Sequence, residues 1–474
     1  MSKIIVLGGG IIGLSTGMML GRQGHDVTVL ERDGDPLPSS PGEAWSAWGR
    51  RGVAQFRQPH YLHSGGHQIF DSHLPDVSEA LLRAGCITFN MLTVMPPSIT
   101  DRAPRRGDER FVTVTGRRPT MEGAVASVAE KALFVRRGVS VTGLLTGSPA
   151  VNGIPHVAGV RTAGGEEISA DLVVDAMGRR SKLPDWVEAI GARRPTEEAE
   201  ESGFIYYSRF FRSRNGAVPR SRGPLFAPFH SFSLLTLPGD SHTWSVTVFI
   251  FSGDEALKGL RTLESWTALL AACPLHVHWL DGEPISDILP MGGITDRYRR
   301  FVVDGAPVAT GIVSVGDAWA CTTPVGGRGI TMGLMHAAGL AEVVRRHLED
   351  PLALTLAYDS MTEARLTPWY RSTVQMDRAR CAQIKAAIEG RAAPRPADPL
   401  AALQVAMMYD ADLFRAAFEI VSLLRLPQEL MARPGMIDRI MEVARTHEAV
   451  PPPGPSRGDL LRILASGGKR RAAA

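Results

Sequence analysis

The chain has few of the residues that build a disulfide framework, a zinc site or a membrane anchor. Its four cysteines are widely spaced and form no CxxC pair, so we expect reduced thiols. No apolar run of roughly 18 residues or more occurs, which argues against a membrane-spanning helix. The chain enters an apolar strand at once, without a cleavable signal, and we therefore expect a cytoplasmic protein.

An excess of charge of one sign is also absent. The net charge of +3 is too small for 474 residues to indicate a nucleic-acid binder. Only six of the 52 basic residues are lysines, a bias toward arginine that we treat as compositional. With 44% hydrophobic and 21% charged residues, the composition is that of a globular protein large enough for two or three domains.

What the chain does contain is a pair of glycine-rich segments about three hundred residues apart. In the first, Ile4–Gly13, four apolar residues predict a buried parallel strand that leads into a helix. Gly8 permits the tight turn, Gly10 the close approach of a pyrophosphate, and Gly13 the packing of the helix on the strand. Glu31 ends the next strand, where a carboxylate accepts hydrogen bonds from a ribose. The alternative is a glycine-rich turn that binds nothing. The order of strand, turn, helix, strand and acid argues against that alternative.

The second segment follows a predicted strand at 312–315. Asp317, at the end of this strand, is placed to bond ribityl hydroxyls, and a predicted helix over 330–346 begins after three glycines. The N-terminal N–H groups of that helix would stabilise negative charge on a reduced flavin. An ordinary strand–loop–helix junction is the alternative for this segment alone. Together the two segments indicate FAD, because a nicotinamide dehydrogenase would leave the second unexplained.

Over about residues 1–350 these motifs resemble the FAD-dependent monooxygenases with the p-hydroxybenzoate hydroxylase-like fold. This superfamily also includes squalene-epoxidase-like, halogenase and geranylgeranyl-reductase branches. The Gly-Asp pair at 316–317 matches the family's motif, with its following proline and glycines, and the 49–53 loop resembles its early basic loop. The cofactor-binding residues that the resemblance implies are Gly8, Gly10, Ile11, Ile12, Gly13, Glu31, Arg32, Arg50, Arg51, Arg118, Val141, Gly178, Gly316, Asp317, Pro324, Gly326, Gly327, Gly329 and Ile330.

The resemblance implies an α/β fold in which a Rossmann-type FAD-binding domain is interleaved with a mostly antiparallel substrate-binding sheet. Aromatic, alternating stretches between 203 and 251 predict that sheet, and a helical section follows it. We also expect helices at 75–84, 121–137 and 459–465, and a strand at 139–141 in the FAD-binding domain. The expected ranges are 1–75, 110–185 and 300–350 for FAD binding, 76–109 and 186–299 for the sheet domain, 351–450 for the helical section, and 451–474 for a linker and flexible tail.

The middle motif departs from the family. The family has Asp-Gly at a strand end, whereas here Met177 stands in the place of the acid and Asp175 lies two residues earlier. Gly178 and Ser181 match, and the arrangement is closer to the geranylgeranyl reductase and halogenase branches. This difference argues against direct recognition of NAD(P)H and for reduced flavin supplied by a separate flavin reductase. Halogenation is disfavoured, because Trp45 and Trp48 do not form the halogenase element and no lysine has the required context.

The resemblance implies that a flavin C4a-hydroperoxide, formed from O2, transfers one oxygen to an apolar or aromatic small molecule. Such chemistry needs no nucleophile–base pair in the protein, and we assign no catalytic residue. A flavin reductase of carbon–carbon double bonds in prenyl-like substrates is the alternative. A protein that binds FAD only as a structural group is a third possibility.

Three smaller features have two interpretations each. Tyr206, Arg209 and Phe211 are candidate substrate contacts, although aromatic strands more often fill a core. The histidines at 60, 63 and 67 have helical spacing, which metal ligands sometimes share, but we favour histidines beside the cofactor or at the surface over a metal site. The charged stretch 296–300 predicts a solvated turn before a strand at 301–303.

Overall fold

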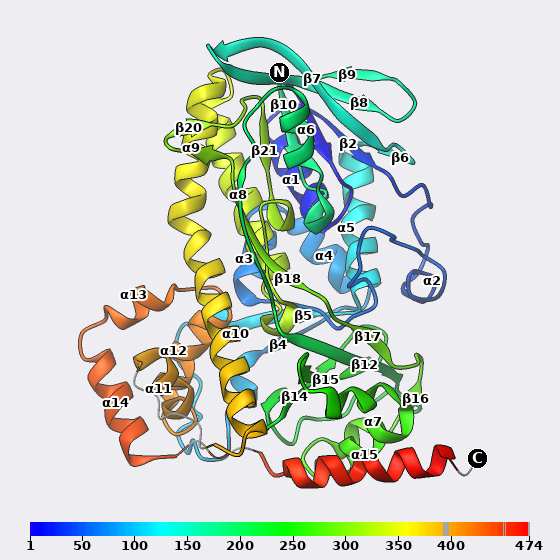
Figure 1. The fold of residues 1–474 in the computed structure, drawn as a ribbon, viewed down its shortest axis with the longest axis vertical. Helices are drawn as coiled ribbons and strands as arrows, with labels where there is room; N and C mark the ends of the chain where they lie inside the picture. Colours follow the sequence, from blue (N-terminus) through cyan, green and yellow to red (C-terminus); the bar gives the residue numbers. More distant parts are fainter. Residues whose placement is uncertain (392–397, 449, 451, 473–474) are drawn as a thin grey trace.

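The computed structural model describes residues 1–391, 398–448, 450 and 452–472. Its upper half in Figure 1 is built on a parallel sheet with the strand order β21-β10-β1-β2-β6. The predicted order of strand, turn, helix, strand and acid at the N-terminus is confirmed. The strands are β1 (Lys3–Leu7), β2 (Asp26–Glu31), β6 (Phe134–Arg137), β10 (Leu172–Asp175) and β21 (Ile312–Ser314).

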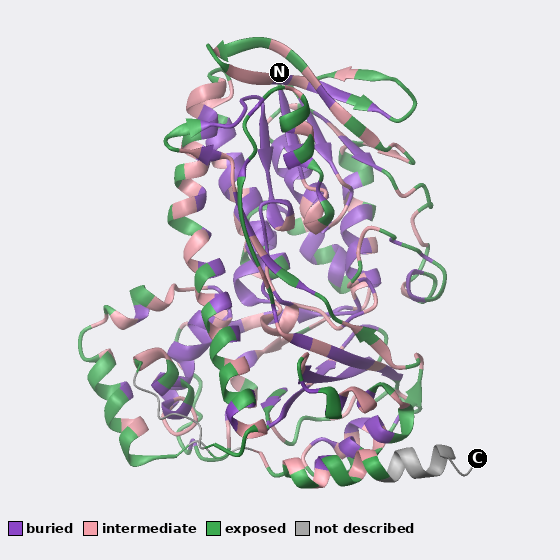
Figure 2. Cartoon of the chain, in the orientation of Figure 1, coloured by how far each residue is buried: buried purple, intermediate pink, exposed green. Residues whose placement is uncertain are grey.

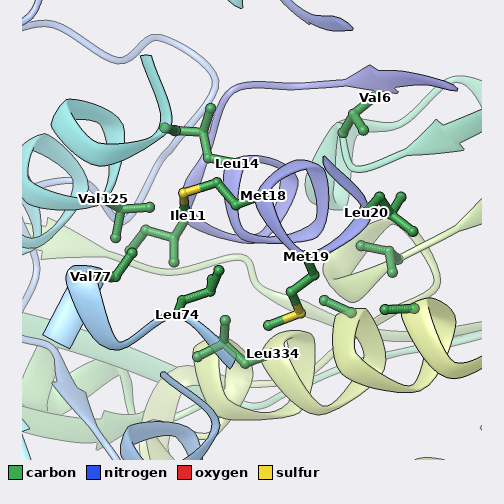
Figure 3. Close-up of a cluster of buried hydrophobic side chains, with 14 of the residues drawn as sticks. Val6, Ile11, Leu14, Met18, Met19, Leu20, Leu74, Val77, Val125 and Leu334 are labelled. Carbon is green, nitrogen blue, oxygen red and sulfur yellow. The ribbon is translucent and has the colours of Figure 1, made fainter. Parts of the chain in front are cut away.

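Both faces of this sheet are covered, which is why its strands are continuously apolar. Ile4 and Val6 of β1 face a helical layer, while Ile5 and Leu7 face the opposite side. Figure 3 shows apolar side chains of α1 meeting Val77, Val125 and Leu334 from neighbouring helices. The helices of this layer are α1 (Ile11–Gly21), α3 (Ser64–His73), α4 (Pro75–Arg83), α5 (Arg118–Ala132) and α8 (Gly329–His347).

The opposite face carries a small sheet and one short helix. Strands β8 and β9 form an antiparallel hairpin, and Figure 2 shows many exposed and intermediate residues along the small sheet, in contrast to the buried parallel strands. The strands β7 (Val141–Val151), β8 (Ile154–Thr162) and β9 (Glu167–Ser169) form this sheet, and α6 (Leu183–Ala189) packs beside it.

Two predictions for the parallel-sheet half were wrong. The helix predicted over 121–137 ends at Ala132, and its last residues form the edge strand β6. Residues 139–141 therefore do not add a strand to the parallel sheet, and Val141 begins β7 instead. The helix α4, which we assigned to the substrate-binding domain, contributes Val77 and Leu81 to the core beneath the parallel sheet.

The lower half in Figure 1 is the predicted antiparallel sheet, with the order β13-β14-β15-β12-β16 and with β17 paired to β12. Its far face packs on α7 (Leu263–Ala271) and on Leu460. The strands are β12 (Phe204–Arg212), β13 (Phe226–Pro228), β14 (Phe232–Pro238), β15 (Thr243–Phe251), β16 (Glu283–Pro284) and β17 (Leu289–Met291). A separate sheet combines β3 (Tyr61–Leu62), β4 (Ile87–Asn90) and β5 (Val112–Thr115).

The charged stretch at 296–300 was predicted to be a solvated turn, and this was wrong. It forms the strand β18 (Thr295–Arg300), which pairs with the acidic strand β11 (Thr196–Glu201) and with β22 (Ala320–Cys321). Arg299 is buried and donates to Glu197 at 2.7 Å. The strands exchange opposite charges across the pair, so the charged side chains need not remain in water.

The C-terminal section is helical, as expected, and α10 runs alongside both halves of the molecule (Figure 1). The short helix predicted at 459–465 is longer and extends to Ala472, which replaces most of the expected flexible tail, and 473–474 lie outside the described residues. No helix in the described part of the chain combines the length and apolarity that crossing a membrane requires. The helices are α9 (Pro351–Arg365), α10 (Thr367–Ile388), α11 (Pro399–Ala406), α12 (Ala411–Val421), α13 (Pro427–Met431), α14 (Met436–Thr446) and α15 (Arg457–Ala472).

Candidate functional site

A cavity of about 2990 Å³ lies where the carboxyl ends of the parallel strands meet the antiparallel sheet and α10. Ligands of open α/β sheets bind at this edge. All the residues expected to bind cofactor line this cavity, except Arg51 and Gly316. Arg51 is exposed, and a Cβ at Gly316 would lie 3.2 Å from Ile12, so the structure gives no separate support for cofactor contacts at these two positions.

The first glycine segment forms the narrow end of the cavity. Gly8 has a φ of +106°, and a Cβ there would lie 2.6 Å from the carbonyl oxygen of Ala176. A Cβ at Gly13 would lie 1.9 Å from the oxygen of Gly8, so both glycines are required by packing. Gly10 has no atom within 4 Å of the Cβ position and borders the cavity. The free N–H groups of the first turn of α1 therefore have room for an anionic group.

Glu31 sits beside this turn in a buried cluster of charges. Its Oε2 accepts hydrogen bonds from the Gly9 N–H at 2.7 Å and from Arg50 at 2.9 Å. Arg50 also lies 3.1 Å from Asp33 and 3.4 Å from Glu122. Burial opposes the charge of Arg50, but these three carboxylates outweigh it and raise its pKa. Arg50 thus holds Glu31 in place at the strand end.

Arg118 connects the charge cluster to the middle of the cavity wall. Its Nε donates to Glu122 at 2.7 Å, and its Nη1 lies 3.0 Å from Nε2 of His60. Burial and the neighbouring Arg118 lower the pKa of His60 to about 3, so this imidazole is neutral. His60 and His63 both precede α3, so the histidines at 60, 63 and 67 do not share a helical face.

In the middle motif, the acid has a structural role, whereas the residues that follow it line the cavity. Asp175 is fully buried and accepts hydrogen bonds from Ser181 Oγ, from the Met177 N–H at 3.0 Å and from Ser314 Oγ at 3.5 Å. Burial raises the pKa of Asp175 to about 6. Met177 and Gly178, in contrast, line the cavity. Asp175 therefore ties β10 to β21 and to the following turn.

The second glycine segment forms the opposite end of the same wall. Asp317 lines the cavity, and burial raises its pKa, while Arg118, Arg179 and Arg297 act against that rise. Arg297 of β18 donates to the carbonyl oxygens of both Arg179 and Asp317, at 2.8 and 3.2 Å. Strand β18, which we had predicted to be a turn, thus holds the middle motif and the second glycine segment side by side.

The N-terminus of α8 opens onto this end of the cavity. Gly329 and Ile330 line it, and the first turn of the helix carries no acidic residue. Gly327 has a φ of +64°, and a Cβ at this position would lie 3.0 Å from the ring of Tyr61. Two helix N-termini and a strand-end carboxylate therefore border one long cavity, an arrangement that fits a dinucleotide such as FAD.

The three candidate substrate residues are not among the residues that line the cavity. The hydroxyl of Tyr206 lies 2.6 Å from Thr323 Oγ1, behind the cavity wall. Arg209 donates to the carbonyl oxygen of Ser286 at 3.2 Å, and Phe211 stacks on Trp244 in the core beneath the sheet. The alternating sequence pattern of β12 does not indicate which face of the strand is directed toward the cavity.

The wall opposite the glycine segments comes partly from the expected substrate-binding domain and partly from the helical section, and the sequence analysis named none of its lining residues. Segment 89–98, β13, β14, α10, α11 and α14 all contribute to it. The only sequence signal was Arg328, a cation set among the glycines of the second segment. Apolar side chains of this wall include Met91, Met95, Leu235, Met376, Val405 and Met441.

Comparisons with known sequences agree with this site. A family model described as FAD dependent oxidoreductase matches residues 3–64. Protein Rv3254 of Mycobacterium tuberculosis is 30% identical over 376 residues, which cover 72% of this chain and 72% of that protein. The chloroplastic zeaxanthin epoxidase of Nicotiana plumbaginifolia is 26% identical over 189 residues, 38% of this chain and 25% of the relative.

Solved structures share the fold. The Diels-Alderase PyrE3 of pyrroindomycin biosynthesis has a TM-score of 0.59 at 18% identity and covers 89% of this chain and 80% of that one. The anhydrotetracycline hydroxylase OxyS from Streptomyces rimosus has a TM-score of 0.57 at 17% identity, with 90% and 76% covered. At these identities the likeness shows the fold alone.

Proposed function

We propose that this chain, which belongs to the FAD-dependent oxidoreductases, inserts one oxygen atom of O2 into an apolar or aromatic small molecule. The observation that carries the proposal is one cavity with two unlike walls. One wall presents the two glycine segments, and the other is largely apolar. A cofactor and an apolar substrate can therefore lie against each other in it.

We assign the cofactor-binding roles to the wall of glycine segments. The first turn of α1 would bind the pyrophosphate, Glu31 the adenosine ribose, and Asp317 the ribityl chain. The first turn of α8 would face the ring end, where its N–H groups favour negative charge. When reduced, the bound FAD supplies the activation of O2 for transfer of one oxygen atom to carbon.

The apolar wall would orient the substrate and exclude water. Overall, substrate, O2 and two electrons with two protons give the oxygenated product and water. NAD(P)H is the ultimate electron source in this proposal, either directly or through a separate flavin reductase. The inward position of Met177, with Asp175 occupied by three hydrogen bonds, favours the separate reductase.

The decisive experiment measures oxygen uptake by the FAD-loaded protein with chemically reduced FAD and a panel of aromatic, polyketide and isoprenoid compounds. We expect uptake to rise with a substrate and an oxygenated product to appear in proportion. Reduction of a double bond without oxygen uptake would instead identify a reductase of prenyl-like substrates. Conversion without any redox change would identify a structural flavin, as the fold shared with a Diels-Alderase allows.

The electron source has its own test. Under anaerobic conditions, NADH and NADPH are mixed in turn with the FAD-loaded protein, and the flavin absorbance is followed. We expect slow bleaching that a purified flavin reductase accelerates. Rapid bleaching by either nucleotide alone would show direct reduction.

A further inference from the structure

Two buried charged groups in the cavity are outside the cofactor-binding roles assigned above. Arg328 is 3% exposed and immediately precedes α8, and Asp377 is 7% exposed on α10. Both line the cavity. A buried charge is costly unless it is paired, so each of these groups requires a partner.

Arg328 has no carboxylate partner. Its Nη1 donates to Thr373 Oγ1 at 2.9 Å, and its Nη2 lies 3.7 Å from the sulfur of Met376. In the described part of the chain, no carboxylate oxygen lies within the 4.0 Å that defines an ion pair with this guanidinium. Burial lowers the pKa of Arg328, in keeping with a cation that is poorly compensated.

Asp377 is equally unpaired. Its Oδ2 atom is buried and, among the described residues, has no hydrogen-bond partner. Burial and the charge of Asp296 raise the pKa of Asp377 to about 8, against the opposing charge of Arg328. The other titratable groups that face it are Tyr206 on β12 and Cys381 on its own helix. A donor is therefore missing at this carboxyl group.

The two groups share one part of the cavity wall. Thr373 and Met376, the partners of Arg328, lie on the turn of α10 that also carries Asp377. Thr373 and Asp377 are four residues apart and so lie on the same face of the helix. A guanidinium cation and a buried carboxyl group thus stand near each other beside the second glycine segment without direct contact.

We propose that Arg328 and Asp377 together bind one hydroxyl group of the substrate. The hydroxyl oxygen accepts a hydrogen bond from the guanidinium, and its O–H donates to the carboxyl group of Asp377. The site then selects neutral hydroxylated apolar molecules over hydrocarbons. Where Asp377 is ionised, above about pH 8, the site disfavours carboxylates because Asp377 and Asp296 repel an anion. This inference rests on the proposed function, since it places the substrate beside the glycine segment.

The test uses 2-naphthol, naphthalene and 2-naphthoate as probes of the FAD-loaded protein. Their Kd values are measured from changes in the flavin absorption spectrum and by calorimetry. We expect 2-naphthol to bind at least 10-fold more tightly than either of the other two probes. Equal binding of 2-naphthol and naphthalene, or tighter binding of 2-naphthoate, would overturn the inference.

Two matched variants locate the effect. At pH 8.5, where Asp377 is largely ionised, Asp377→Asn should raise the Kd of 2-naphthol about 10-fold and leave that of naphthalene within twofold, because a hydrogen bond to a charged acceptor becomes a neutral one. Asp359→Asn is the control, since Asp359 is a partly buried carboxylate that pairs with Arg300 away from the cavity. Equal effects of the two substitutions would count against the inference.

The pH dependence gives a readout that a purely structural role would not produce. Between pH 6 and 8.5 Asp377 ionises, so the preference of the wild-type protein for 2-naphthol over naphthalene should grow, while that of Asp377→Asn should stay flat. Holoprotein that consumes O2 with a substrate but binds both probes alike would overturn this inference alone. Protein that retains no FAD would overturn the proposed function and the inference with it.

Discussion

At the scale of single residues, glycine is required at Gly13 and Gly10 for different physical reasons. A Cβ at Gly13 would collide with the backbone oxygen of Gly8, so folding itself demands glycine there. Gly10 has open space at its Cβ position and an ordinary extended backbone with φ −82°. A side chain at Gly10 would therefore clash only with a bound ligand.

This difference predicts that Gly10→Val and Gly13→Ala separate binding from stability. Gly13→Ala should lower the free energy of unfolding of the apoprotein by about 1–3 kcal/mol, because the helix must move away from the turn. Gly10→Val should leave that free energy within ~1 kcal/mol but reduce FAD retention at least 10-fold. Urea unfolding and flavin absorbance measure the two effects. Normal flavin content in Gly10→Val would show that the pyrophosphate lies elsewhere.

Asp317 gives a second prediction at this scale. Asp317→Ala should raise the Kd for FAD by about 10-fold or more, the usual cost of losing a hydrogen bond to a charged group. Asp185→Ala serves as the control, because Asp185 pairs with Arg194 at the surface, where such pairs contribute little. Fluorescence titration of the apoprotein with FAD gives both values. An unchanged Kd in Asp317→Ala would refute its assigned role.

At the scale of elements, Asp175 connects the parallel strands β10 and β21 with the turn that follows β10. That turn borders the cavity. Asp175 is charged only at a cost, since burial raises its pKa from the ordinary 3.8 to about 6. A raised pKa in the folded state means that its stabilising contribution is complete below about pH 4. That contribution is lost as the pH rises to 6 and the buried carboxylate ionises.

Replacing Asp175 with Asn should remove this dependence. We expect the free energy of unfolding of the wild-type protein, relative to Asp175→Asn, to fall by about 3 kcal/mol between pH 4 and pH 7. Denaturant unfolding of both proteins at a series of pH values measures the difference. A difference that stays constant, or that grows with pH, would show that Asp175 does not hold its proton in the folded state.

In two elements, pairing with another strand outweighed the local sequence pattern. Residues 133–135 are apolar and continue the helical pattern of α5, yet hydrogen bonds to β2 draw them into the sheet. The sequence Asp-Arg-Tyr-Arg-Arg of β18 is typical of a solvated turn when considered alone. Its pairing with the glutamates of β11, far away in the sequence, supplies the opposite charges that make it a strand.

At the scale of the whole molecule, the chain ends by returning to the antiparallel sheet. Leu460 of α15 is 1% exposed and joins the core beneath that sheet, whereas the adjacent Leu461 is 41% exposed. Arg457 and Asp254 form an ion pair at 2.6 Å beside it. The C-terminal helix thus closes the half of the molecule that forms the apolar wall of the cavity.

Leu460→Ala and Leu461→Ala test this closure. We expect Leu460→Ala to lower the free energy of unfolding by about 2–5 kcal/mol, through lost burial and the cavity left behind. Leu461→Ala should change it by no more than ~0.5 kcal/mol, as for most exposed positions. Chemical unfolding gives both numbers. Similar values for the two variants would mean that α15 does not pack on the sheet.

The cofactor end of the site could be predicted because its determinants are local. Strand, glycines, helix and acid follow one another within Ile4–Glu31, so chain geometry alone places Gly10 and Glu31 at one strand end. The same holds for Asp317 and Gly329. Two adjacent arginines, Arg50 and Arg51, offer no local signal of which one turns inward, and in the structure only Arg50 meets the carboxylates.

By itself, then, the sequence determined the parallel sheet, the two glycine turns and the cofactor they accept, since each depends on residues within one strand–turn–helix unit. The tertiary structure alone decided the opposite wall. It turned Tyr206 and Phe211 away from the cavity and brought Asp377 of α10 near Arg328. These contacts join segments that are distant in the chain, and no spacing along the sequence encodes which side chains long-range packing leaves facing a cavity.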